Sequence, residues 1–168
     1  MKQIIGGYRL FFLDLLHRLS ELHIDVKGMP ISHLCYRVRT LSEYKLRRDQ
    51  IKPFCKSISE SDFNGRPVSM LLLKTPLRLA ESYSTSLIEL PAPKISHEYT
   101  AGIEHCGFVV KNFSQFKKKY GSLLTGQKDH GPNCKPLFLT FENGKTAKFY
   151  DITLKEVVLL DGWKFKAL

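Results

Sequence analysis

The sequence predicts an α+β protein in which an N-terminal helix precedes two consecutive runs of strand, helix and three strands. Apolar side chains recur at helical spacing in residues 8–22. Side chains alternate in character along residues 31–39, as in a strand with two different faces. The same order of elements recurs beyond a proline-containing connector at residues 91–101. A chain of 168 residues is long enough for one compact domain with a sizeable core.

The N-terminal extension, residues 1–30, is expected to form one amphipathic helix. Its apolar side chains follow the i, i+3, i+4 rhythm, and Gly6-Gly7 places the start of the helix near Tyr8. Gly28 and Pro30 end this pattern before the first strand.

The first strand-rich run occupies residues 31–90. The expected elements are a strand at 31–39, a helix from Leu41 that Pro53 stops, and strands at 56–63, 66–74 and 82–90. Asn64-Gly65 is a strong signal for a two-residue hairpin. Pro76 predicts a further turn between the last two strands.

The second run occupies residues 102–152, and a C-terminal tail follows at 153–168. The expected elements are a strand at 102–110, a helix at 113–124, a loop at 127–133, strands at 135–142 and 145–152, and a short helix in the tail. Asn112 or Ser114 can cap the helix, and Asn143-Gly144 predicts a hairpin. The sequence signal for the first strand after the helix of this run is weak.

The composition predicts a globular protein of the cytoplasm. The hydrophobic fraction is 43%, and no apolar run approaches the roughly 20 residues that span a bilayer. The N-terminal segment is interrupted by Arg9 and Asp14 and lacks a small-residue cleavage site, so we expect no signal peptide and no membrane association. The 4 cysteines form no C-x-x-C pair and are expected to be reduced and buried.

The net charge of +10 favours acidic partners such as phosphorylated metabolites, nucleic acid or anionic lipid. The basic clusters are modest, however: Arg47-Arg48 and Lys117-Lys118-Lys119. Both fall in predicted helices, where such a run is typically a solvated face. We therefore expect a small anionic ligand rather than nucleic acid, and a monomer or a homodimer.

Polar side chains share one face of four predicted strands. Alternation places His33, Cys35 and Arg37 together, and likewise Glu89 with Thr85 and Leu87, His105 with Gly107 and Val109, and Lys148 with Tyr150. The same alternation turns Glu104 away from His105. Two imidazoles and one carboxylate suit a divalent transition metal, namely Zn, Fe, Mn, Co or Ni. The alternative is a set of scattered polar residues on a solvated sheet.

The chain resembles a known family in five blocks. These are "ISHLCYRV", "NGRPVSMLLLK", "TSLIELPAPK", "HEYTAGIEHCGFVV" and "GKTAKFYDITLKEVV", within about residues 8–160. In this order they are similar to blocks of the YecM-like proteins, a bacterial group within the vicinal-oxygen-chelate (glyoxalase/dioxygenase) superfamily. The combination "IELP…HE…EH" is the most specific part of the resemblance.

The resemblance implies two side-by-side βαβββ modules that form a cup-shaped mixed sheet and hold one divalent metal. Ligands in that superfamily come from the first and last strand of each module, which implies His33, Glu89 and His105 here. The fourth position falls near Lys148 or Tyr150, where the chain has neither Glu nor His. Tyr150 could ligate only as a phenolate, or it could hydrogen-bond a bound water at a three-residue site.

The resemblance implies a metal-dependent isomerase, lyase or dioxygenase that acts on a small anionic molecule through Lewis-acid chemistry. Arg37 either grips a carboxylate or phosphate of the substrate or neutralises Glu89, and Lys148 is a second candidate for substrate binding. His97-Glu98 could form a lid or proton shuttle, or be an exposed loop pair; His130 is expected to be a turn residue. Two alternatives stay open: a non-catalytic small-ligand-binding protein of the same fold, and a basic nucleic-acid-binding protein.

Overall fold

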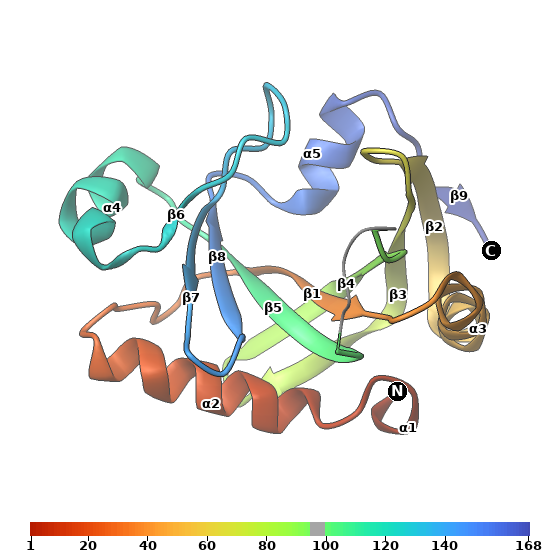
Figure 1. Cartoon of the computed structure of the whole chain (residues 1–168), viewed down its shortest axis with the longest axis horizontal. Coiled ribbons are helices and arrows are strands. Elements are labelled where there is room, and N and C mark those ends of the chain that lie inside the picture. Colours follow the sequence, from red (N-terminus) through yellow and green to blue (C-terminus); the bar gives the residue numbers. More distant parts are fainter. Residues whose placement is uncertain (95–99) are drawn as a thin grey trace.

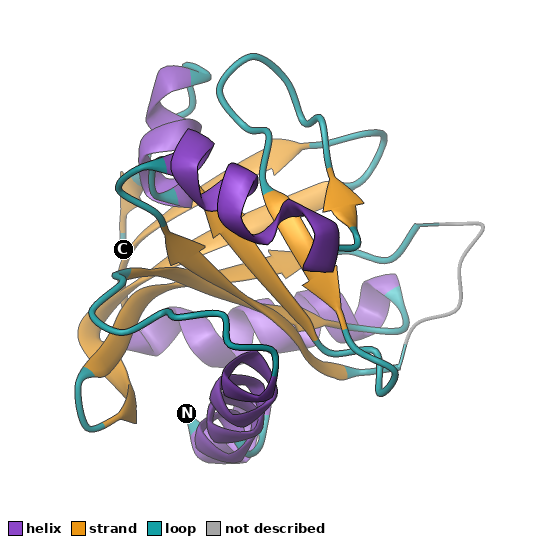
Figure 2. Cartoon of the chain, turned by 90° about the vertical axis from the view of Figure 1, so that its left-hand side faces the viewer, coloured by secondary structure: helices purple, strands orange, loops and turns teal. Residues whose placement is uncertain are grey.

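A single curled sheet organises the molecule, with helices on both of its sides (Figures 1 and 2). The computed structural model describes residues 1–94 and 100–168. The helices are α1 (Lys2–Ile5), α2 (Tyr8–Glu21), α3 (Leu41–Ile51), α4 (Phe113–Tyr120) and α5 (Leu154–Leu160), with 3-10 turns η1 (Lys52–Phe54) and η2 (Gly121–Leu123). The strands are β1 (Ile31–Arg37), β2 (Cys55–Asp62), β3 (Pro67–Ala80), β4 (Tyr83–Pro91), β5 (Gly102–Val109), β6 (Gly126–Gln127), β7 (Leu137–Thr140), β8 (Thr146–Tyr150) and β9 (Lys166–Ala167).

The two halves of the sheet repeat one arrangement around its centre. The strand order is β6-β7-β8-β5-β1-β4-β3-β2-β9. At the centre β1 pairs antiparallel with β5, whereas β1 is parallel to β4 and β5 is parallel to β8. The first and last strands of each run are therefore neighbours, and all four lie at the middle of the sheet. The predicted α+β architecture with an N-terminal helix is confirmed.

Helix α2 covers one face of the sheet (Figure 1). Phe12, Leu15 and Leu19 on this helix are fully buried. The Phe12 ring stacks on Phe108 of β5, with centroids 6.1 Å apart, and leans on Tyr83 of β4 at 5.1 Å. Burial of each such side chain contributes on the order of 2 kcal/mol. The helix therefore packs its apolar side on the central strands of the sheet. This agrees with the amphipathic helix predicted from the spacing of apolar residues in 8–22.

Helix α5 packs on the opposite face and closes a second, smaller core (Figure 1). Its Leu154, Val157 and Val158 lie against apolar side chains of β3, β4 and β8. A capping box between Thr153 and Glu156 begins the helix. The predicted tail is therefore part of the core, and its last residues add β9 to the edge of β2.

The predicted hairpins form where the sequence signals them. Asn64 and Gly65 have φ values of 54° and 74°, the left-handed conformation that a two-residue turn between β2 and β3 requires. Gly144 has a φ of 77° in the turn between β7 and β8. Asn112, rather than Ser114, caps α4 by accepting a hydrogen bond from the Gln115 amide. The strand with the weak sequence signal is β6, which is only 2 residues long.

The turn predicted at Pro76 is wrong, because β3 continues through this residue to Ala80. Pairing of β3 with β2 ends at Leu73, and its pairing with β4 is interrupted between Leu72 and Leu77. Proline has no backbone N–H. It is therefore tolerated where the strand makes no backbone hydrogen bond to a neighbouring strand. Sequence position alone does not reveal such a gap.

No helix within residues 1–94 and 100–168 is long and apolar enough to cross a membrane. The cysteines at positions 35, 55, 106 and 134 are free and buried, as predicted.

Candidate metal centre

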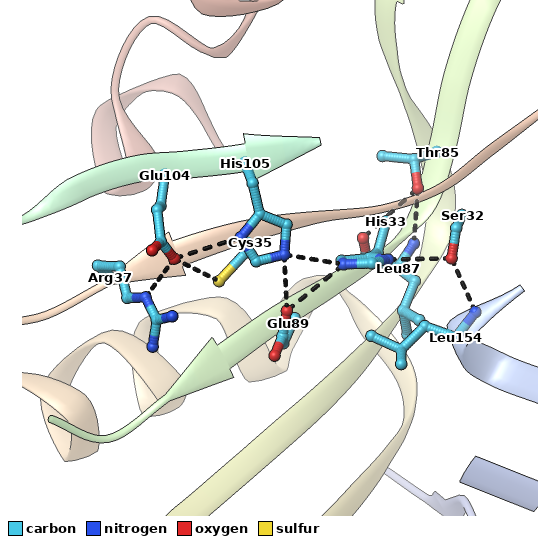
Figure 3. A network of polar contacts seen from close by, with 10 residues as sticks. All are labelled: Ser32, His33, Cys35, Arg37, Thr85, Leu87, Glu89, Glu104, His105 and Leu154. Atoms are coloured by element: carbon cyan, nitrogen blue, oxygen red, sulfur yellow. Dashed lines mark hydrogen bonds and ion pairs between the residues drawn. The ribbon is translucent and has the colours of Figure 1, made fainter. Parts of the chain in front are cut away.

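His33, Glu89 and His105 meet at one point on the face of the sheet that carries α5 (Figure 3). The Nε2 atoms of the two histidines are 3.2 Å apart. The Glu89 carboxylate places Oε2 3.1 Å from Nε2 of His105 and 3.4 Å from Nε2 of His33. These residues come from β1, β4 and β5, whose central register aligns Cys35 with both Glu89 and His105. The structure therefore brings together the three residues that the sequence suggested.

Burial and close contacts set the charges of His33 and Glu89 at the centre. Both histidine side chains are fully buried, and the Glu89 side chain is 18% exposed. Burial lowers the pKa of His33 to about 4, so this imidazole is neutral at pH 7. Burial alone would raise the pKa of Glu89, but the close contacts with the imidazoles of His105 and His33 hold it well below its usual range. A neutral imidazole and a charged carboxylate are the forms that bind metal.

Two irregularities in the pairing of β1 with β5 surround the centre. Pairing steps from Ile31–Phe108 to His33–Gly107, which leaves Ser32 as an extra residue on β1. It also steps from Cys35–His105 to Tyr36–Ile103, which leaves Glu104 as an extra residue on β5. Each extra residue immediately precedes one of the two histidines.

The prediction that Glu104 faces away from His105 is wrong. Its Oε2 lies 3.2 Å from Nδ1 of His105 (Figure 3). The bulge at Glu104 breaks the alternation of side chains, and it re-aims the carboxylate toward its neighbour. Burial would raise the pKa of Glu104, but hydrogen bonds from His105 and Arg37 lower it to about 2. Regular alternation could not reveal this residue, because no glycine or proline marks the bulge.

Arg37 lies beside this carboxylate: its Nε donates to Oε2 of Glu104. Cys35, Glu104 and His105 form a second group of candidate ligands. The guanidinium of Arg37 already pairs with the Glu104 carboxylate. Burial raises the pKa of the Cys35 thiol well above its usual value, so the thiol keeps its proton. Both features disfavour a cation in this second group. A role for Arg37 in substrate binding stays a prediction.

Gly107 is required by the close approach of its neighbours. A Cβ at this position would lie 2.6 Å from Cε1 of His33 and 3.0 Å from Cε2 of Tyr150. Real Cβ contacts of that length do not occur without displacement of a ring. Because Gly107 has no side chain, the His33 ring can lie against its Cα. The alternation of side chains along the strand could not predict this role.

Tyr150 packs edge-on against His33, with ring centroids 5.3 Å apart and an interplanar angle of 73°. Burial raises its pKa well above the usual value, so the side chain stays a phenol. Its role as a fourth ligand stays a prediction. Lys148 of β8 is aligned with Gly107, and its charge contributes to the low pKa of His33. Within the described residues, Lys148 forms no salt bridge, and its role in substrate binding also stays a prediction.

Two further histidine predictions concern loops. His97-Glu98 lies outside the described residues. His130 lies between β6 and β7, where its half-buried ring packs edge-on against Phe63 at a centroid distance of 5.5 Å. His130 lies immediately before the turn at residues 131–134 rather than within it, and it also contacts the β2–β3 hairpin.

The donor set fits one divalent ion. Ligand atoms about 2.1 Å from a metal lie about 3.0 to 3.4 Å from each other at octahedral or tetrahedral angles. The three separations at the centre, 3.1, 3.2 and 3.4 Å, fall in this range. Three protein ligands leave further coordination positions of such an ion for water or a substrate.

Comparison with protein families finds the family described as YecM protein, which matches residues 1–149. The chain belongs to the YecM family. No curated protein matches the sequence.

Solved structures place this YecM protein among others of the same fold. A structural-genomics protein, EC4020, superposes with a TM-score of 0.77 at 23% identity, over 95% of this chain and 92% of its own. Hypothetical protein BH1468 from Bacillus halodurans C-125 superposes with a TM-score of 0.52 at 15% identity, over 73% of this chain and 94% of its own. At these identities, both are similarities of fold.

Proposed function

We propose that this YecM protein binds one divalent transition-metal ion through His33, Glu89 and His105 and acts on a small anionic molecule. The observation that carries the proposal is the mutual approach of three donor atoms, 3.1 to 3.4 Å apart, at a buried point. Zn, Fe, Mn, Co and Ni all accept two imidazoles and a carboxylate.

The hydrogen bonding of His105 favours a positive group at the centre. The Glu104 carboxylate can only accept, so Nδ1 of His105 carries a proton, and in the neutral form of the ring Nε2 carries a lone pair. That lone pair faces the Glu89 carboxylate at 3.1 Å. Two acceptors this close repel each other in a buried site, unless a proton or a metal ion lies between them.

The arrangement of the two halves supports membership of the vicinal-oxygen-chelate superfamily. Each half has a first and a last strand that run parallel as neighbours, and the halves meet through the antiparallel pair β1–β5. His33 and Glu89 lie on the first and last strands of one half, and His105 lies on the first strand of the other. We infer that residues 31–90 and 102–152 are the two βαβββ modules of such a protein.

The surroundings of the centre suit an anionic ligand. A bound divalent ion would supply Lewis-acid stabilisation of an oxyanion, as isomerases, lyases and dioxygenases use it. Lys148 adds a positive charge on the same strand as Tyr150, and the phenol of Tyr150 can donate a hydrogen bond because it stays protonated. Helix α5 and the second core pack on the neighbouring strands β3, β4 and β8 of the same face.

Metal analysis of the protein, purified without a metal-affinity tag, tests this proposal. We expect one equivalent of a first-row transition metal, or one equivalent after reconstitution, and loss of binding in the double variant His33→Ala/His105→Ala. The matched control is His17→Ala/His23→Ala, two histidines on or beside α2 at the opposite side of the sheet. Failure to bind Zn, Fe(II), Mn, Co or Ni after reconstitution would refute the proposal.

A further inference from the structure

Ser32 and Glu104 occupy equivalent places in the two halves of the sheet. Each is the extra residue of a β-bulge and each immediately precedes a histidine of the centre. Oγ of Ser32 lies 2.9 Å from Nδ1 of His33, and Oε2 of Glu104 lies 3.2 Å from Nδ1 of His105 (Figure 3). Both residues therefore contact the ring nitrogen that points away from the proposed metal.

The chemistry of the two contacts differs. A carboxylate has no proton to donate at neutral pH, so Glu104 admits only the tautomer of His105 with its proton on Nδ1. Arg37 donates to the same oxygen of Glu104 and holds the carboxylate in place. The neutral His105 ring consequently presents the lone pair of Nε2 to the centre.

Ser32 allows both tautomers of His33. Its Oγ accepts a hydrogen bond from the Leu154 amide at the start of α5, 2.7 Å away. A hydroxyl still has one lone pair and one proton available. It can donate to Nδ1 of His33, which places the ring proton on Nε2, or accept from Nδ1, which frees Nε2 for a ligand.

We propose that Glu104 and Ser32 are positioning residues with different roles: Glu104 fixes His105 in its ligating tautomer, whereas Ser32 lets His33 change tautomer on metal binding and links that change to α5. This inference rests on the proposed function. In metal-free protein, the Nε2 proton of His33 points at Nε2 of His105 and at Glu89, 3.2 and 3.4 Å away, and relieves the repulsion between these acceptors. On metal binding, the ring proton would shift from Nε2 to Nδ1 of the same imidazole, with no net gain or loss of protons, and the Nδ1–H would donate a hydrogen bond to Oγ of Ser32.

The tautomers can be measured directly by ¹⁵N NMR of the histidine rings near neutral pH. We expect His105 to carry its proton on Nδ1 with and without zinc. We expect His33 to carry it on Nε2 without zinc and on Nδ1 with zinc. A His105 proton on Nε2 in metal-free protein would overturn the inference whether or not zinc binds, and so would a His33 tautomer that zinc leaves unchanged. Absence of zinc binding would instead refute the proposed function, and the metal-free spectrum would still decide the role of Glu104.

Variants separate positioning from a general effect on folding. Ser32→Ala and Glu104→Gln are each expected to weaken zinc binding about 10- to 100-fold, the usual effect of a lost contact behind a ligating histidine. The control for Ser32 is Ser69→Ala, since Ser69 is a buried strand hydroxyl bonded to Tyr44. The control for Glu104 is Glu60→Gln, since Glu60 also pairs with an arginine, Arg48.

Each control should retain wild-type zinc affinity even if it lowers stability. Ser32→Ala should also shift the NMR signals of α5, because the Leu154 amide loses its acceptor. Equal zinc affinities for a variant and its matched control would overturn the assignment for that residue.

Discussion

The imidazoles of His33 and His105 meet edge to face at their Nε2 atoms, 3.2 Å apart, with ring planes at 90°. The two residues are separated by 72 positions in the chain. They meet because β1 and β5 are the antiparallel pair at the centre of the sheet, and because a bulge precedes each histidine. The Glu89 carboxylate approaches the same point from β4, on the other side of β1.

Gly107→Ala should damage the centre through the His33 ring. The new Cβ would lie 2.6 Å from Cε1 of His33, so the ring or the strand must shift. Overpacking of this kind typically costs about 1 to 3 kcal/mol. We expect that loss of stability in urea titrations of metal-free protein, together with at least a 10-fold weaker zinc affinity. Gly121→Ala is the control, because nothing lies within 4 Å of a Cβ there; equal zinc affinities for the two variants would argue against the predicted role of Gly107.

Acid should destabilise the metal-free protein through His33. Its folded-state pKa is about 4, below the value of 6.5 for the unfolded chain, because burial disfavours the charged ring. As pH falls from 6.5 to about 4, the unfolded state therefore binds a proton that the folded state does not, and the free energy of unfolding falls by up to about 1.4 kcal/mol per pH unit. Urea titrations across this window should show a steeper decline for wild type than for His33→Gln. Identical slopes would contradict a neutral, buried His33.

Metal should reverse this trend by binding only the folded state. Zinc at about 100 times its dissociation constant adds about 2.7 kcal/mol to the free energy of unfolding. We expect a higher melting temperature with zinc, its reversal by a chelator, and a smaller effect at acid pH, where protons compete for the imidazoles. The zinc-induced increase in the free energy of unfolding should be smaller in Glu89→Gln than in wild type. An increase of the same size in Glu89→Gln would exclude the carboxylate as a ligand.

The capping box of α5 should stabilise the second core. Thr153 accepts a hydrogen bond from the Glu156 amide, and the Glu156 carboxylate accepts one from the Thr153 amide. Removal of the cap in Thr153→Ala should lower the free energy of unfolding by about 1 kcal/mol. Thr40→Ala removes the corresponding cap of α3, a helix that contributes no residue to the centre, and is the comparison. Zinc affinity should fall in the first variant alone if α5 is linked to His33 through Ser32.

The sequence predicted the elements well because their signals are local. The rhythm of residues 8–22 and the Asn-Gly turn at position 64 act within a few residues and need no tertiary information. The shared face of His33, Glu89 and His105 could also be anticipated, since alternation holds along most of these strands. What the sequence could not supply was set by pairing between distant strands. The bulge that turns Glu104 toward His105 and the unpaired stretch that accepts Pro76 both depend on a partner strand.

The location of a bound ion tests the central claim most directly. Anomalous diffraction at the zinc absorption edge, from crystals of the zinc-loaded protein, would locate it without reference to activity. We predict a single site with zinc about 2.0 to 2.2 Å from Nε2 of His33, Nε2 of His105 and a carboxylate oxygen of Glu89. Zinc bound instead to the sulfur of Cys35 with Glu104, or only at surface residues, would contradict the account.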